Sequence, residues 1–236
     1  DSLYQYTRGT LDKLEKAGLM PEYVQTGNEI NPGFLLPKGD RWQRNGEDFI
    51  YLMNGAIQGV RDAAQSSPID PKVILHIAQP ENIKEFFNGL QEAGLNEFDV
   101  IGFSYYYIWS NIRIGQISNV VAELKAEFDQ QIMILETAYP WTKGDADGYN
   151  NIMDSSKLNP RFPATPQGQY EYLVTLTQEL IEGGGDGIFY WEPAWISCNI
   201  QTQWGTGSAW DHHALFDFQG NVLKGIDYMN QSYCLQ

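Results

Sequence analysis

Short runs of apolar residues recur along the chain and alternate with stretches of a different, helical periodicity. Five of the runs are mostly continuous instead of alternating with polar residues, at 23–26, 73–78, 100–105, 132–135 and 187–191. A strand that is buried on both faces has this pattern, which is typical of parallel sheets. The runs therefore predict five strands of one parallel sheet.

The segments before and between these runs have apolar residues every three to four positions, which predicts amphipathic helices packed on a core. These segments lie at 3–14, 49–63, 83–93, 120–128 and 170–181, and a short helix is expected around 222–229. Asp1 or Ser2 is suited to cap the first helix, and Gly18 is suited to end it. The alternation of strands and helices predicts an α/β fold with right-handed crossovers.

Two α/β architectures fit this order, a doubly wound sheet and a TIM (β/α)8 barrel. No glycine-rich phosphate-binding loop follows a predicted strand, which weakens the doubly wound, nucleotide-binding alternative. Several predicted strands are instead followed by residues able to do chemistry, where a barrel builds its active site: Asn28, Glu29, Gln79, Tyr105, Tyr106, Glu136, Trp191 and Glu192. We therefore expect residues 1–236 to form one catalytic barrel domain.

Only five of the eight barrel strands are predicted, and the chain opens with a helix. We expect about three βα units, on the order of 100 residues, to be missing at the N-terminus. They would be cleaved, absent or carried by another chain, which would then be a partner. Two long loops, at 142–167 and 192–216, account for part of the 236 residues.

Composition narrows the class of protein. The chain has 42% hydrophobic and 19% charged residues, as a globular domain has. Its net charge of −15 argues against nucleic acid as a partner, and no apolar run reaches the roughly 18–20 residues of a membrane span. The 7 Trp, 14 Tyr and 11 Phe fit either a core or a cleft that stacks on sugar rings. Cys198 and Cys234 either form one disulfide or are two free, buried thiols.

Two glutamates end predicted strands, Glu29 the first and Glu136 the fourth. With three units before them, these strands become the fourth and seventh of eight, and the carboxylates face one cleft. Two carboxylates about 5 Å apart hydrolyse a glycosidic bond with retention, one as acid and one as nucleophile. Both could be ordinary strand-end acids, but Asn28 beside Glu29 and the aromatic neighbours of both favour catalysis.

Four separated motifs resemble glycoside hydrolase family 53, the endo-β-1,4-galactanases that act on galactan side chains of pectin. They are VQTGNEINPG at 24–33, FSYY at 103–106, ETAYPW at 136–141, and a C-terminal motif of WD at 210–211 with ALFD at 214–217. The resemblance implies an enzyme with a polysaccharide substrate that is secreted, periplasmic or on the cell surface. Another retaining β-glycanase, such as a mannanase or cellulase, and an inactive glycan-binding fragment remain alternatives.

The resemblance also implies roles for single residues. Glu29 is then the acid/base, Glu136 the nucleophile, Asn28 the partner of the sugar 2-OH and Trp191 the platform under the cleaved sugar. Either Tyr105 or Tyr106 would hydrogen-bond the nucleophile. Further tryptophans are candidates for neighbouring sugar subsites or for loop packing: Trp109, Trp141 and Trp195.

Oxygen-bearing side chains alternate in the loop at 145–151, as Asp145, Asp147 and Asn151. Hard cations prefer such ligands, although a polar turn has the same pattern. By the family resemblance this loop binds a structural Ca²⁺ together with Ser208 and Asp211, and Tyr149 would offer its backbone carbonyl where the family often has His. The adjacent His212 and His213 are expected to be exposed to solvent instead of binding zinc.

Overall fold

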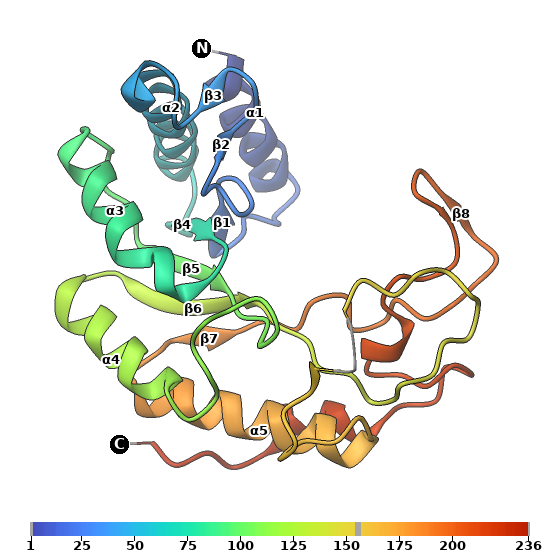
Figure 1. Ribbon diagram of the computed structural model, residues 1–236. Helices are drawn as coiled ribbons and strands as arrows, with labels where there is room; N and C mark the ends of the chain where they lie inside the picture. Colours follow the sequence, from blue (N-terminus) through green and yellow to red (C-terminus); the bar gives the residue numbers. More distant parts are fainter. Residues whose placement is uncertain (1, 154–156, 236) are drawn as a thin grey trace. The chain divides into compact units, whose positions relative to one another are not determined.

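The computed structural model describes residues 2–153 and 157–235, and all five predicted strands are present in it (Figure 1). They are β1 (Tyr23–Gln25), β4 (Lys72–Ile77), β5 (Val100–Ser104), β6 (Gln131–Glu136) and β7 (Gly187–Ile188). Their order in the sheet is β1-β4-β5-β6-β7, so it follows their order in the chain. β1 pairs with β4 and β4 with β5 in parallel, which confirms the predicted α/β class.

The five predicted α-helices are confirmed, each within a few residues of its expected ends. They are α1 (Ser2–Lys16), α2 (Glu47–Ala64), α3 (Ile83–Glu92), α4 (Ile117–Glu127) and α5 (Pro166–Glu182). Short 3-10 helices are η1 (Arg44–Gly46), η2 (Pro80–Asn82), η4 (Asp211–His213) and η5 (Lys224–Asn230). The helix expected near 222–229 is therefore the 3-10 helix η5. The proposed cap at Asp1 lies outside the described residues.

The chain forms two compact units, of which the first comprises Asp1–Tyr105 and Leu124–Ile134. Within it α1 packs on α2, where a side chain at Gly59 would come within 3.0 Å of Thr7 Cβ and Tyr4 O. Nearly every residue of β4 and β5 is buried. Strands buried on both faces need apolar side chains on both, which is why their sequences do not alternate.

The second unit comprises Tyr106–Glu123 and Leu135–Gln236. Its longest helix, α5, has Thr165 as N-cap, whose hydroxyl accepts a hydrogen bond from the Gly168 N–H at 3.0 Å. The buried face of α5 includes Tyr172, which stacks on Tyr139 with 4.0 Å between ring centroids. η5 packs along the same helix.

Two small antiparallel hairpins were not expected from the sequence. One is β2 (Gly33–Phe34) with β3 (Gly39–Asp40) in the first unit, and the other is β8 (Gln201–Thr202) with β9 (Gly205–Thr206) in the second. Strands of two residues are too short to produce a periodic pattern. β7 likewise ends at Ile188 instead of continuing to Trp191.

Neither cysteine is bridged. Cys198 and Cys234 are free thiols, but both are exposed, so the expectation that free thiols would be buried is wrong. No helix in the described part of the chain is long and apolar enough to cross a membrane.

Candidate active site

A tight turn directly after β1 presents Asn28 and Glu29. Gly27 has φ 98° and Glu29 has φ 46°, both in the left-handed region. A side chain at Gly27 would lie 2.7 Å from Ile30 Cγ2, so this position needs glycine. The chain returns to the sheet at Ile30, whose N–H donates to His76 O at 2.9 Å. The turn thereby places Glu29, half-buried, at the carboxyl end of a parallel strand.

Polar side chains from β4 and β5 contact both residues of the turn. The Ser104 hydroxyl lies 2.6 Å from Glu29 Oε1 and 3.0 Å from His76 Nε2. His76 Nδ1 lies 2.9 Å from Asn28 Oδ1. Burial lowers the pKa of His76 to about 4. Sequence reasoning gave neither His76 nor Ser104 a role, although a single histidine inside an otherwise apolar strand was a usable signal.

Glu136 ends β6 in the second unit and is only 6% exposed. The Tyr106 hydroxyl donates a hydrogen bond to Glu136 Oε2 at 3.0 Å. Tyr105 is completely buried in the first unit. Of the two tyrosines considered for this contact, the structure therefore gives it to Tyr106.

Trp191 lies three residues beyond β7, and its backbone is fixed from two sides. Its N–H donates to Thr137 O at 2.9 Å, and its carbonyl accepts from Trp210 Nε1 at 3.1 Å. The indole itself is 40% exposed. A fixed backbone with an exposed ring is suited to be a platform.

An apolar cavity of about 1080 Å³ opens beside Trp191 in the second unit. Trp195 and Trp204 line it as well, and Trp204 is 69% exposed. Trp204 lies between β8 and β9, where the Tyr149 hydroxyl donates to its carbonyl at 2.7 Å. Trp204 was missed from sequence because the hairpin that presents it was not predicted.

The two other candidate tryptophans differ from each other in exposure: Trp109 is 45% exposed, whereas Trp141 is half-buried. Trp109 meets Tyr106 edge-on, with 5.0 Å between ring centroids. Trp141 donates through Nε1 to Asp211 O at 3.1 Å and packs against Phe218 at 4.8 Å. These contacts are those of a packed loop residue, so they favour the packing interpretation of Trp141.

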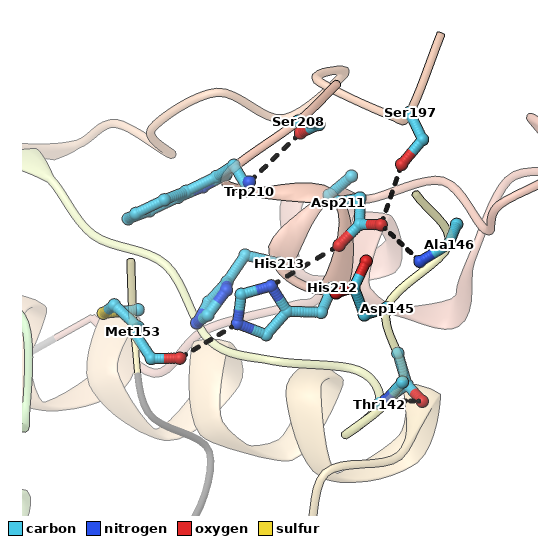
Figure 2. A network of polar contacts seen from close by, with 12 residues as sticks. Thr142, Asp145, Ala146, Met153, Ser197, Ser208, Trp210, Asp211, His212 and His213 are labelled. Atoms are coloured by element: carbon cyan, nitrogen blue, oxygen red, sulfur yellow. Dashed lines mark hydrogen bonds and ion pairs between the residues drawn. The ribbon is translucent and has the colours of Figure 1, made fainter. Parts of the chain in front are cut away.

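Three carboxylates of the two long loops converge in the second unit, from Asp145, Asp147 and Asp211. One oxygen of each lies within 4.8 Å of the others. Asp211 is fully buried, and its Oδ2 accepts from the Ser197 hydroxyl at 2.8 Å and the Ala146 N–H at 2.9 Å (Figure 2). Three carboxylates this close repel one another unless a cation offsets their charge. The donor set therefore fits a hard cation.

Burial disfavours the ionised form of Asp147, but hydrogen bonds outweigh this effect. The N–H groups of Tyr149 and Ser208 donate to it and, together with the nearby Ser197 hydroxyl, lower its pKa. The Ser208 hydroxyl donates elsewhere, to Trp195 O at 2.7 Å. With its amide nitrogen turned toward Asp211, Asn151 donates to Asp211 Oδ1 at 3.3 Å. Of the six predicted ligands, the structure thus brings the three aspartate carboxylates together.

The expectation that His212 and His213 are exposed is wrong. They are 2% and 0% exposed, because the short helix η4 turns both into the interior. The His212 Nε2–H donates to Met153 O at 3.1 Å (Figure 2). Burial lowers the pKa of His212, so the ring is neutral near pH 7 and does not offset the charge of Asp211, whose Oδ1 lies 3.7 Å from Nδ1.

The chain is similar in sequence to known proteins. "Arabinogalactan endo-beta-1,4-galactanase" of Cellvibrio japonicus is 41% identical over 98% of this chain and 63% of its own length. "Endo-beta-1,4-galactanase" of Bacillus subtilis is 29% identical over 95% and 58%. The chain therefore spans less than two thirds of the length of these relatives.

The chain is also similar in structure to solved proteins. The "Ignisphaera aggregans GH53 catalytic domain" matches with a TM-score of 0.88 and 34% identity, over 99% of this chain and 65% of that one. Xylanase B of Clostridium stercorarium matches with a TM-score of 0.57 and 14% identity, over 97% and 65%, which shows a shared fold alone.

The family comparison covers nearly the whole chain. Residues 1–229 match the family described as "Glycosyl hydrolase family 53". The turn with Asn28 and Glu29 and the strand end at Glu136 lie within the matched residues. The chain belongs to glycosyl hydrolase family 53.

Proposed function

We propose that this chain hydrolyses internal bonds of β-1,4-galactan with retention of anomeric configuration. Membership of the family and the names of the Cellvibrio and Bacillus relatives support the reaction and the substrate. Glu29 is the acid/base and Glu136 the nucleophile of this proposal.

The proposed reaction has two steps. Glu29 gives its proton to the glycosidic oxygen while a Glu136 oxygen attacks the anomeric carbon, so that the C–O bond breaks and a galactosyl ester forms. Glu29, now a carboxylate, then takes a proton from water, whose oxygen displaces Glu136. The Asn28 amide donates to the sugar 2-OH, a contact that strengthens as the oxocarbenium ion develops.

One observation carries this assignment. Glu29 lies in the turn after β1 and Glu136 is the last residue of β6, and each carboxylate contacts a hydroxyl side chain. Ser104 lies 2.6 Å from Glu29, and Tyr106 lies 3.0 Å from Glu136. Ordinary strand-end acids on a surface do not need such partners, whereas catalytic groups must be fixed in position.

The cavity in the second unit supports an extended substrate. Three indoles line it, those of Trp191, Trp195 and Trp204, and their apolar faces suit the C–H faces of galactose rings. A neutral polymer also suits a chain with a net charge of −15. Because such a polymer cannot enter a cell intact, the proposal includes a secreted, periplasmic or cell-surface location and a role in pectin degradation.

The proposal includes a structural Ca²⁺ at Asp145, Asp147 and Asp211. These residues lie on two loops, 142–167 and 192–216, which are too long to be ordered at low entropic cost without cross-links. A cation between their carboxylates would connect one loop to the other. The buried carboxylate of Asp211 supports the assignment, because burial without a compensating charge is costly.

A polysaccharide panel tests the proposed function. The protein in its natural length is incubated with galactan, mannan and cellulose, and reducing ends are counted. We expect release from galactan, with the β-anomer formed first in proton NMR spectra. Release from mannan or cellulose alone would assign another β-glycanase, binding of galactan without release a glycan-binding protein, and a first-formed α-anomer an inverting reaction.

A further inference from the structure

Glu192 lines the aromatic cavity of the second unit, and the proposed reaction gives it no role. It is the one charged residue among the described residues that line this cavity. The hydroxyls of Tyr149 and Thr202 line it as well, but they donate to backbone carbonyls of the β8–β9 hairpin at 2.7 and 2.9 Å. Within residues 2–153 and 157–235, the Glu192 carboxylate has no hydrogen bond or ion pair. The carboxylate is therefore available to a ligand, whereas the two hydroxyls are already engaged.

The backbone of Glu192 has an unfavourable conformation. Its φ of 50° lies in the left-handed region, which residues other than glycine rarely adopt. Pro193 follows it, and a residue before proline is further restricted toward extended conformations. Strained residues of this kind are concentrated at functional sites. Glycine would suit the backbone here, so the presence of glutamate indicates a role for its side chain.

Hydrogen bonds on both sides of Glu192 hold this conformation. Before it, the Trp191 carbonyl accepts from Trp210 Nε1 at 3.1 Å. After it, the Leu215 N–H donates to Pro193 O at 2.7 Å. The backbone of Glu192 is thus fixed before a ligand binds, which lowers the entropic cost of binding.

A carboxylate beside indoles suits the hydroxyl groups of a sugar ring that stacks on those indoles. Its two oxygens only accept hydrogen bonds, and two hydroxyls on neighbouring carbons can satisfy both of them. In a β-1,4-linked galactan the linkage uses the oxygen at C4 of each internal ring. The 2-OH and the 3-OH are therefore the neighbouring pair that an internal galactosyl ring offers.

We propose that Glu192 is a specificity-determining residue, which accepts hydrogen bonds from the 2-OH and 3-OH of one galactosyl ring in the cavity. This inference rests on the proposed function. The 2-OH of the ring at the cleaved bond is assigned to Asn28, so Glu192 binds a neighbouring ring. The protein then requires an unsubstituted 3-OH on that ring, and a galactan with branches on O3 is cleaved only where this ring carries none.

Calorimetry tests the contact in the Glu136→Ala background, where the ligand is not turned over. Galactotetraose is compared with an analogue that lacks the 3-OH on all four rings. The analogue should bind at least about 10- to 100-fold more weakly, the scale of a hydrogen bond to a charged group. Adding Glu192→Ala should weaken galactotetraose binding by a similar factor and reduce the ratio of the two Kd values by about 10- to 100-fold.

A structural role alone would weaken the binding of both ligands equally, so an unchanged ratio of Kd values in Glu192→Ala would overturn the inference. The matched control is Glu171→Ala, at an exposed glutamate of α5 that accepts from Gln167 at 2.9 Å. This control should leave both Kd values unchanged.

Glu192→Gly separates binding from stability. Glycine suits the left-handed backbone, so Tm should stay the same or rise, whereas the Kd for galactotetraose should increase as it does in Glu192→Ala. A lower Tm would show that the glutamate side chain stabilises the fold, and it would overturn the inference. This variant also decides the question if Glu192→Ala does not fold.

The outcomes distinguish this inference from the proposed function. Galactotetraose that the unaltered protein neither binds nor hydrolyses would defeat the proposed function, and this inference with it. Hydrolysis of galactan together with an unchanged ratio of Kd values in Glu192→Ala would defeat this inference alone.

Discussion

The Tyr106 hydroxyl donates a hydrogen bond to Glu136 Oε2 at 3.0 Å, and the ring of Tyr106 makes edge-on contacts with both Trp109 and Trp210. The aromatic contacts fix the ring, so the hydroxyl has little freedom to turn away. A donor in this place orients the carboxylate and stabilises its charge for the attack that we propose.

Tyr106→Phe is therefore expected to lower kcat on galactan about 10- to 100-fold. A hydrogen bond to a charged group contributes about 1.5–3 kcal/mol, and each 1.36 kcal/mol is tenfold in rate. The matched control is Tyr170→Phe, which removes a surface hydroxyl bonded to Gln231 and should leave kcat unchanged. An unchanged kcat in Tyr106→Phe would show that this contact does not serve the reaction.

Removal of the proposed nucleophile should stop the reaction while leaving substrate binding intact. Glu136→Ala is expected to lose at least about 10⁴-fold in kcat, the scale seen when other hydrolases lose a nucleophile. Binding of galactan oligosaccharides, measured by calorimetry, should persist because the indoles of the cavity are untouched. Substantial residual hydrolysis would place the nucleophile at another residue.

His76 makes stability depend on pH in a defined direction. Its pKa is about 4 in the folded protein and about 6.5 when exposed in the unfolded chain, so the unfolded state takes up the proton first as pH falls. The stability that the neutral ring provides is complete above pH 6.5 and decreases between pH 6.5 and 4, by about 3 kcal/mol in total.

Denaturant unfolding from pH 7 to 4, with chelator present, measures this loss. The His76→Gln variant has no titrating ring and should lose correspondingly less over the same range. Parallel curves for the two proteins would show that His76 is already protonated in the folded state or is not buried in solution.

The sequence predicted the elements in which apolar residues recur in a regular pattern over several positions. The continuous apolar runs gave the five parallel strands because a buried strand needs apolar side chains on both faces. Glu29 and Glu136 became candidates because polar residues at the ends of such runs are conspicuous, and the structure places both at strand ends. The convergence of Asp145, Asp147 and Asp211 was expected because the first two alternate within a short loop and the third belongs to a C-terminal motif.

Features that depend on distant contacts were not predictable in the same way. His76 lies inside an apolar run, and only the position of Asn28 and Ser104 in space gives it partners. His212 was expected to be exposed because a polar ring is costly to bury without a partner. In the interior, Met153 O accepts a hydrogen bond from this ring. The exposed position of Trp204 depends on the hairpin of β8 and β9, whose two-residue strands are too short to give a periodic pattern in the sequence.

Removal of Ca²⁺ should destabilise the protein if Asp145, Asp147 and Asp211 bind it. A ligand at 100 times its Kd stabilises by about 2.7 kcal/mol, and each kcal/mol shifts Tm by about 2–4 °C in a domain of this size. Chelator should then lower Tm by about 5–10 °C, as measured by calorimetry. Asp211→Asn should abolish this response, and Asp129→Asn, at an exposed position in the first unit, should keep it. A Tm that chelator leaves unchanged would count against the metal.

Trp204 is expected to bind the substrate without taking part in the reaction itself. Its indole is 69% exposed at the rim of the cavity that Trp191 and Trp195 also line, so one face is free to stack on a galactose ring. An aromatic contact of this kind contributes about 0.5–1.5 kcal/mol, and it is present equally in the ground state and the transition state. Trp204→Ala should therefore raise KM for galactan about three- to tenfold with little change in kcat. Trp42→Ala, at an equally exposed tryptophan of the first unit, is the control and should leave both constants unchanged. A lower kcat in Trp204→Ala at unchanged KM would instead place this indole against the sugar at which the bond is cleaved.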